Sequence, residues 1–144
     1  MELGSIKLTW TKLRELNGAT LYLCDSIVGE KRFKTKTGIL SSGDEAWMHS
    51  NIREWLNDDF YLKHFDAYER GKLVKHDDTG DKVFLLSMEE YGDGYNAINM
   101  DEDWWLRPSG DSAIPPVVFA CGDASRDYAG YFILGIRPAI LVRD

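Results

Sequence analysis

The chain has 144 residues, which fits a single domain and is long enough for a substantial core. Its hydrophobic share of 44% argues against an intrinsically disordered chain. The formal net charge of −7 argues against nonspecific binding of nucleic acid, which needs clustered Lys and Arg to displace counterions. This charge fits either plain solubility or an acidic surface that meets a basic partner protein.

The only two cysteines, Cys24 and Cys121, form neither a metal-binding pattern nor a disulfide framework. Both lie in apolar surroundings, which favours buried free thiols. The opening residues form no signal peptide, and no apolar run is long enough to cross a bilayer. We therefore expect a cytoplasmic protein without a membrane partner, or an extracellular one if the chain was cut from a larger secreted protein.

The beginning of the chain predicts a hairpin. Residues Ile6–Trp10 alternate in polarity as a strand does, and Asn17–Gly18 is a strong turn signal. The apolar segment Ala19–Cys24 would return as the second strand. The polar stretch Lys34–Gly43 is typical of a surface loop.

The middle of the chain predicts two short helices. The first covers Ser50–Asp59, because the Ser50 hydroxyl can accept a hydrogen bond from a backbone N–H of the first turn. One face of this helix follows the 3.6-residue period and carries Ile52, Trp55, Leu56, Asp59 and Phe60. The second covers Asp66–Leu73 and begins with a capping box formed by Asp66 and Glu69.

Strands dominate the predictions for the second half. The apolar run Lys82–Leu86 is typical of an interior strand, and Ser87–Glu90 is a further capping box that would start a brief helical turn. Residues Gly92–Asp103 are expected to form a loop. The remaining predicted strands are a hairpin of Val117–Cys121 with Tyr128–Leu134, joined by Gly122–Ser125, and a last short strand at Ala139–Val142.

The stretch Asp103–Gly110 places two adjacent indoles, a leucine and an arginine before a turn. Neighbouring side chains of an extended segment point to opposite faces, so Trp104 and Trp105 would face two different layers. Arg107 needs acceptors if it is buried, because an unpaired buried charge is costly. The sequence offers Asp103, Asp111 and Asp123 as internal partners. We interpret these residues as part of a structural hub composed of Trp55, Trp104, Trp105, Arg107 and Arg137.

Four landmarks in this order resemble a family of domains of unknown function, DUF6273, which is common in Firmicutes and their phages. They are the opening hairpin at Trp10–Cys24, the helix motif at Ser50–Tyr61, the Lys-Val-Phe-Leu-Leu-Ser strand with its acidic turn at Lys82–Glu90, and Trp-Trp-Leu-Arg followed by Gly-Ile-Arg-Pro-Ala at Trp104–Arg107 and Gly135–Ala139. The resemblance covers nearly the whole chain, residues 1–144. Where the family usually reads Leu-Arg-Ser-Pro-Gly, this chain has Pro108 before Ser109.

The resemblance implies an architecture and little chemistry, because the family carries no established activity. Its members are distantly similar to the C-type-lectin-like fold of formylglycine-generating enzymes. The expected fold is therefore α+β, with one twisted, mostly antiparallel sheet and two short helices packed against it, in a C-type-lectin-like arrangement.

The acidic loop after Gly92 suggests a cation site. Calcium takes six to eight oxygen ligands from flexible backbone, and this loop is rich in such oxygens, although its spacing is not that of an EF-hand. Asp and Asn are also ordinary loop residues. The residues that would hold Ca²⁺ are Asp93, Asn96, Asn99, Asp101 and Asp103. No other cofactor is expected.

Aromatic and charged residues in or beside loops suggest a surface for a partner. Trp and Tyr anchor protein interfaces and stack on sugars, although the same rings can equally fill the core. The residues considered for contact with a protein or glycan are Trp47, Tyr95, Asp101, Asp103, Arg107, Asp123 and Tyr128.

The sequence does not predict an enzyme. No His or Cys belongs to a recognisable catalytic signature, and Cys24 and Cys121 do not match the paired-cysteine copper site of formylglycine-generating enzymes. We expect a noncatalytic module that binds a protein or glycan through loops around the Trp-Trp-Leu-Arg hub. The alternative is a small inhibitor, encoded by a phage or mobile element, that binds a host protein through its acidic surface.

Overall fold

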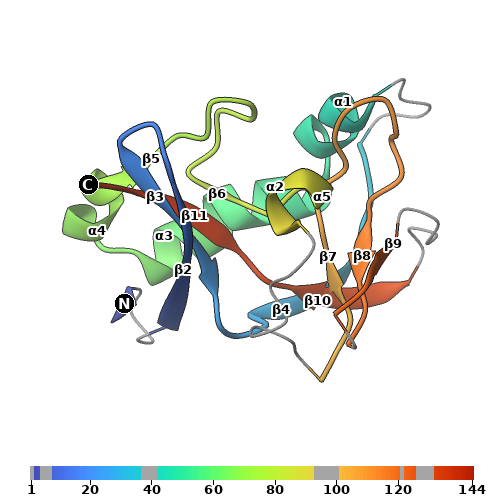
Figure 1. Cartoon of the computed structure of the whole chain (residues 1–144), viewed down its shortest axis with the longest axis horizontal. Coiled ribbons are helices and arrows are strands. Elements are labelled where there is room, and N and C mark those ends of the chain that lie inside the picture. The colour runs from blue at the N-terminus through green and yellow to red at the C-terminus, as the bar shows by residue number, and fades with distance from the viewer. Residues whose placement is uncertain (1, 4–7, 37–41, 93–100, 121, 126–131) are drawn as a thin grey trace.

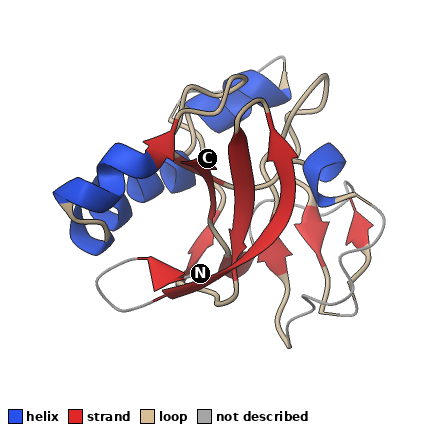
Figure 2. Cartoon of the chain, turned by 60° about the vertical axis from the view of Figure 1, so that its left-hand side comes forward, coloured by secondary structure: helices blue, strands red, loops and turns tan. Residues whose placement is uncertain are grey.

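The computed structural model describes residues 2–3, 8–36, 42–92, 101–120, 122–125 and 132–144. Its strands form two sheets, and in Figure 1 β2, β3 and β5 lie on the left and β7, β8 and β9 on the right. Turned by 60°, the strands are seen to curve, with helices to the left of, above and to the right of them (Figure 2). The α+β class and the predominance of antiparallel pairing are confirmed, whereas the prediction of one sheet is wrong.

The first sheet contains the predicted opening hairpin, but its first strand extends to Leu16 rather than ending at Trp10, and Ile6 and Lys7 lie outside the described residues. β2 (Leu8–Leu16) and β3 (Ala19–Cys24) pair across a turn in which Asn17 and Gly18 both have positive φ, a conformation that favours these two residue types. The sheet order is β1-β2-β3-β11-β5, with β6 also paired to β11, and every pairing is antiparallel. The other members are β1 (Glu2–Leu3), β5 (Leu73–Val74), β6 (Val83–Phe84) and β11 (Ala139–Arg143).

The second sheet has the order β4-β10-β7-β8-β9. Its strands are β4 (Gly29–Arg32), β7 (Trp104–Trp105), β8 (Val117–Val118), β9 (Ala124–Ser125) and β10 (Ile133–Ile136). β10 runs parallel to β7, and the other pairs are antiparallel.

The predicted hairpin of Val117–Cys121 with Tyr128–Leu134 is wrong for the described end of its second strand, and residues 128–131 lie outside the described residues. β8 pairs with β9, because the chain turns back within a few residues at Gly122, which has a φ of 99°, and Phe119 N–H donates to the Asp123 carbonyl. β10 instead pairs with β4 and β7.

Arg137 lies where the last two strands pass from one sheet to the other. Its guanidinium Nε donates to the Cys24 carbonyl at 2.6 Å, and its charge lies 5.0 Å from the Trp104 ring centroid. Beside it, Cys24 N–H donates to the Pro138 carbonyl and Val28 N–H to the Ile136 carbonyl, both at 2.9 Å. Arg137 is buried and contacts the Cys24 carbonyl and the Trp104 ring. These contacts support its place in the structural hub.

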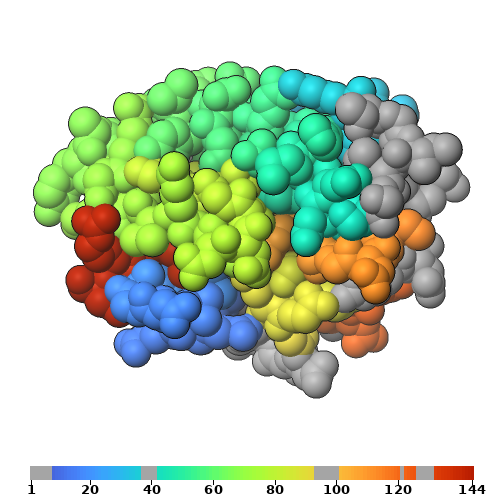
Figure 3. Space-filling view, turned by 90° about the horizontal axis from the view of Figure 1, so that it is seen from above, coloured from blue at the N-terminus to red at the C-terminus, as the bar shows by residue number. Residues whose placement is uncertain are grey.

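The helices are more numerous than the two that the sequence predicts. The predicted capping boxes start α4 (Ala67–Lys72) and α5 (Met88–Tyr91), with the side-chain contacts expected of each. α1 (Gly43–Met48) begins at the last residue of the expected loop Lys34–Gly43, and the Ser42 hydroxyl accepts from Glu45 N–H at its start. Seen from above, residues 43–91, which include all of the described helices, cover much of one face of the molecule (Figure 3).

The predicted Ser50–Asp59 helix is longer than expected and changes type in its middle. α2 (Asn51–Trp55) continues into the π-helical turn η1 (Leu56–Phe60) and then α3 (Tyr61–His64), and Ser50 caps it as predicted. Its buried residues Ile52, Leu56 and Phe60 are each four apart. In a pure α-helix, residues four positions apart are rotated relative to one another around the helix axis. The π turn contains more residues per turn, which keeps these three side chains directed at the core.

The hub tryptophans occupy the centre of the molecule. Trp104 packs edge-on against Tyr91 at 5.7 Å, whereas Trp105 packs against Phe33 at 6.0 Å and its indole N–H donates to the Lys31 carbonyl. Both rings are fully buried and meet different partners, as expected for adjacent residues of a strand. Trp55, the fifth predicted hub residue, is only partly buried and lies at the edge of the core.

Candidate functional site

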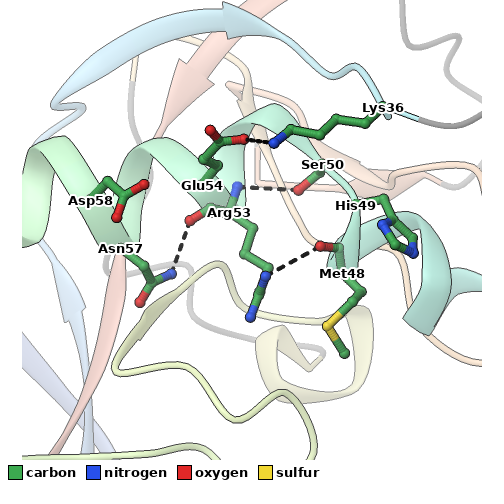
Figure 4. A pocket seen from close by; sticks show the side chains of 8 residues that line it. All are labelled: Lys36, Met48, His49, Ser50, Arg53, Glu54, Asn57 and Asp58. Atoms are coloured by element: carbon green, nitrogen blue, oxygen red, sulfur yellow. Dashed lines mark hydrogen bonds and ion pairs between the residues drawn. The ribbon is translucent and has the colours of Figure 1, made fainter.

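The exposed side of the helix formed by α2, η1 and α3 borders three neighbouring cavities. We call this surface the helix face and define it by the residues that line these cavities. The first cavity has a volume of about 470 Å³ and lies at the start of α2 (Figure 4). Its lining residues are Lys36, Met48, His49, Ser50, Arg53, Glu54, Asn57 and Asp58.

Most charges around this first cavity are paired within the protein. Arg53 Nε donates to the Asp81 carboxylate at 2.9 Å, and its Nη1 donates to the Met48 carbonyl at 3.2 Å. The Lys36 ammonium reaches across the helix to Glu54 at 2.5 Å (Figure 4). These pairs hold the start of α2 in place and leave Asp58 at the border of the cavity.

The other two cavities flank Trp55. The larger, of about 600 Å³, is lined by Val28, Trp55, Asp58, Asp59, Phe60, Leu62, Lys63 and His64. The smaller, of about 280 Å³, is lined by Asn51, Glu54, Trp55, Asp58 and Asp59. Asp58 therefore borders all three cavities of the helix face, and Trp55 and Asp59 border two.

The Trp55 ring is held in a fixed position by its neighbours. The Lys31 ammonium lies 5.3 Å from the ring centroid, Phe60 packs against the ring at 5.7 Å, and Gly29 lies against its outer edge. An added Cβ at Gly29 would come within 3.2 Å of the ring. The indole N–H of Trp55 has no hydrogen-bond acceptor among the described residues, so this donor remains available to a ligand.

Asp58 and Asp59 also keep their hydrogen-bonding capacity. Both side chains are exposed, and neither carboxylate has a hydrogen bond or ion pair with another described residue. The π turn matters here because the extra residue in the turn shifts the helix surface that follows it, and π turns occur frequently at functional sites. The helix face thus combines a fixed indole with two unpaired carboxylates.

His64 borders the larger Trp55 cavity without adding positive charge to it. Burial, together with the neighbouring Lys63 charge, lowers the pKa of the imidazole below its ordinary value of 6.5. The ring is therefore mostly neutral at pH 7. Its Nδ1 atom is buried and has no hydrogen-bond partner among the described residues.

A second cluster of ionisable groups lies in the interior around Glu90. Arg107 Nη1 donates to one carboxylate oxygen at 2.5 Å, and His76 Nε2 lies 2.5 Å from the other. The Ser87 N–H donates to the same oxygen that Arg107 contacts, and Arg14 donates to the Glu90 carbonyl. We call Glu90, Arg107 and His76 the buried triad.

The buried triad has the geometry of a structural anchor. Although burial raises the pKa of Glu90, its hydrogen bonds and the Arg107 charge lower that pKa to about 2, so the carboxylate is ionised at neutral pH. The His76 Nδ1 accepts from Asp78 N–H at 3.0 Å, so Nε2 carries the proton that it donates to Glu90. Both ring nitrogens are engaged, and neither is free to take a proton from a substrate.

Cys24 is likewise poorly suited to nucleophilic chemistry. It is buried and free, and burial raises the pKa of its thiol to about 11. The protonated thiol is a weak nucleophile at neutral pH. The expectation of a buried free thiol is therefore confirmed for Cys24, whereas Cys121 lies outside the described residues.

Two residues predicted to contact a partner are buried instead, which corrects the prediction. Trp47 is 2% exposed and its indole N–H donates to the Asp81 carboxylate at 2.8 Å, so this ring belongs to the core. Arg107 is 4% exposed and is paired with Glu90. The acidic partner is Glu90 rather than Asp103, Asp111 or Asp123, because α5 places its capping glutamate beside the hub.

Of the other predicted partner residues, the structure leaves Asp101 and Asp123 exposed and brings Asp103 into a backbone contact. Asp103 accepts a hydrogen bond from Ala120 N–H at 2.8 Å. Tyr95 and Tyr128, together with the proposed calcium ligands Asp93, Asn96 and Asn99, lie outside the described residues. Among residues that are described, no group of three or more His, Cys, Asp or Glu side chains is arranged to hold a metal ion.

The sequence did not single out the acidic pair of the helix face. Asp59 was expected on the apolar side of the helix, and the π turn moves it to solvent. A signal was present nevertheless: Trp55 followed by Asp58 and Asp59 places an indole and two carboxylates one turn apart. Glu90 was recognised only as a capping residue, and its pairing with His76 and Arg107 depends on contacts that are remote in sequence.

Comparison with known proteins supports the family expected from the sequence landmarks. Neither the curated proteins nor the solved structures contain a match to the chain. Within the described residues, none of the helices combines the length and apolar character needed to traverse a bilayer. The family model described as domain of unknown function DUF6273 matches residues 17–143, most of the chain. The chain therefore belongs to the DUF6273 family.

Proposed function

We propose that the chain is a noncatalytic binding module for a protein or glycan, and that the helix face is its contact surface. One observation carries this proposal: Trp55, Asp58 and Asp59 border shared cavities with their polar atoms unpaired by described residues. Polar groups that a protein needs for its own structure normally have partners inside it. Polar groups that have none and lie together at a concavity are therefore suited to bind a ligand.

The helix face supports this function better than the loops around the hub. Trp47 and Arg107 are used within the core, and Asp103 is engaged with the backbone. Asp101 and Asp123 are exposed but do not border any of the cavities described above. The engaged nitrogens of His76 and the protonated thiol of Cys24 agree with a noncatalytic role for these two buried groups.

The test is a parallel selection of ligands from a random peptide library and from an array of bacterial cell-wall oligosaccharides. We expect ligands that bind the unmodified chain and are lost when Asp58 and Asp59 are both changed to Asn. Tyr68→Ala is the control, because Tyr68 is an exposed aromatic residue on α4 that lines none of these three cavities. Ligands that bind the double Asn variant and the unmodified chain equally would exclude the helix face.

A second candidate function is a small inhibitor of a host protein. The observation that favours it is the net charge of −7 together with the unpaired Asp58 and Asp59. This proposal includes a cytoplasmic location and an origin in a phage or mobile element of Firmicutes. An inhibitor would abolish the activity of the captured partner at a one-to-one ratio, whereas a binding module would leave that activity intact.

The proposed module includes a C-type-lectin-like arrangement of its two sheets. The support for it is the set of four sequence landmarks, together with the antiparallel β2–β3 hairpin closed by the last strand β11. An experimental structure superposed on C-type lectin domains would test it, and a different order of strands in the two sheets would contradict it.

A further inference from the structure

We infer that the helix face recognises a basic segment of a protein partner, with an arginine side chain placed at Asp58 and Asp59 beside Trp55. This inference rests on the proposed binding function and goes further by naming the chemistry of the ligand. It is carried by the two carboxylates of the surface that have no ion pair among the described residues, the packing of the indole and the size of the cavities.

The charge of the smaller Trp55 cavity is negative. Glu54, Asp58 and Asp59 line it, and no Lys, Arg or His does. Lys36 pairs with Glu54 at 2.5 Å, and Lys31 lies 5.3 Å from the Trp55 ring without lining this cavity, so the two aspartates are the lining carboxylates with no ion pair among the described residues. The larger cavity adds one basic group, Lys63, to the same two aspartates, and the neutral His64 adds none at pH 7. Electrostatic complementarity therefore favours a cationic ligand.

The packing of Trp55 favours a cation over a stacked sugar. A pyranose stacks on an open ring face, and Lys31 already covers one face of this indole at 5.3 Å. Phe60 packs against the ring, and Gly29 closes its outer edge. What remains for a ligand is the indole N–H and the neighbouring carboxylates.

The chemistry of the two carboxylates suits arginine in particular. A guanidinium presents several N–H donors in a planar fork and can bind two carboxylate oxygens at once. Asp58 and Asp59 are adjacent on the helix, and both border the same two cavities. The smaller cavity, of about 280 Å³, accommodates the end of one long side chain, and the larger one can accept the residue next to it.

The experiment is an NMR titration of the ¹⁵N-labelled chain with short Gly-Ser peptides that contain two arginines. The matched control peptide replaces each arginine by citrulline, which keeps the shape of the side chain and removes its charge. We expect the arginine peptide to shift amide signals between Asn51 and His64, and the citrulline peptide to bind at least about tenfold more weakly. Raising the salt concentration should weaken the arginine peptide selectively.

The variant with Asp58→Asn and Asp59→Asn should lower affinity for the arginine peptide by about tenfold or more. Asp77→Asn with Asp78→Asn is the matched variant, because these are also adjacent exposed aspartates and the change in net charge is the same. Equal loss in both variants would show a general effect of net charge and would overturn the inference. Equal binding of arginine and citrulline peptides would overturn it as well.

The same titration separates failure of this inference from failure of the proposed function. If cell-wall oligosaccharides shift the signals of Asn51–His64 and arginine peptides do not, the cationic ligand is excluded while the binding module stands. If neither class of probe shifts these signals at millimolar concentration, both the ligand class and the helix face are excluded.

Discussion

The buried triad and the helix face use the same kinds of side chain for different ends. In the triad, each carboxylate oxygen of Glu90 has a partner at 2.5 Å, and both nitrogens of His76 are engaged. On the helix face, Asp58 and Asp59 have no partner among the described residues and border cavities instead. Ionisable residues therefore indicate a binding surface only when the fold has left their hydrogen-bonding capacity unused.

The two arginines of the structural hub are likewise used inside the protein. Arg107 and Arg137 stand in conspicuous sequence motifs and are both buried, where they hold Glu90 and the Cys24 carbonyl. Truncating such a residue would leave buried acceptors without donors and would change stability first. The two regions can accordingly be distinguished by measuring stability and binding in the same set of variants.

The largest effect is expected for Trp104→Ala in the core next to the triad. Its ring is fully buried against Tyr91 and the Arg137 charge, so we expect a loss of about 3–5 kcal/mol in the free energy of unfolding. Urea denaturation followed by circular dichroism measures it. A loss below about 1 kcal/mol would show that this ring lies at the surface, contrary to the structure.

Glu90→Ala should also destabilise the chain strongly. Removing this carboxylate leaves the Arg107 charge buried without its acid, which typically costs about 3–5 kcal/mol. Glu89→Ala is the control, since Glu89 is the exposed neighbour on the same helix. The free energy of unfolding of both variants is measured by denaturant titration. Equal values would contradict the structural role of Glu90.

Acid should weaken the triad in a defined pH range. Because the folded pKa of Glu90 is about 2 and the ordinary value is 4.5, the stabilisation is complete above about pH 4.5 and is lost as the pH falls toward 2. One proton contributes at most about 1.4 kcal/mol per pH unit. The Glu90→Gln variant should lack the part of the pH dependence of stability that comes from Glu90. The free energies of unfolding of this variant and of the unmodified chain are measured from pH 6 to pH 2, and their difference gives that part. A constant difference over that range would exclude a lowered pKa.

The smallest effect on stability is expected for Asp58→Asn on the helix face. An exposed carboxylate without a described partner contributes little to folding, so the free energy of unfolding should change by less than about 0.5 kcal/mol. Thermal denaturation provides the measurement. If the variant unfolds much more readily, Asp58 has a structural role and the contrast between the two regions does not hold there.

Local signals in the sequence predicted local features of the fold. The Asn17–Gly18 turn, the Ser50 cap and the Asp66 and Ser87 capping boxes each depend on residues a few positions apart, and each is present in the structure. The burial of Trp104 and Trp105 could likewise be predicted, because two adjacent indoles in an extended segment have a large apolar area to bury.

Features that depend on remote contacts were not predictable in this way. The pairing of β10 with β4 and β7 joins segments far apart in sequence, and periodicity does not reveal which strand a segment will choose. The π turn at Leu56–Phe60 arises from packing of the helix against the core, and it decides that Asp59 faces solvent. The candidate site was missed for this reason, since its position depends on that turn.

The position of β11 has a consequence for how the protein is made. This strand lies between β3 on one side and β5 and β6 on the other, although it is formed by residues 139–143. As the chain leaves the ribosome, β2 and β3 can pair early, but the apolar edge of β3 stays open until β11 has been synthesised. Unpaired strand edges of this kind promote association between chains, so the interval before β11 emerges is the stage of synthesis most exposed to aggregation.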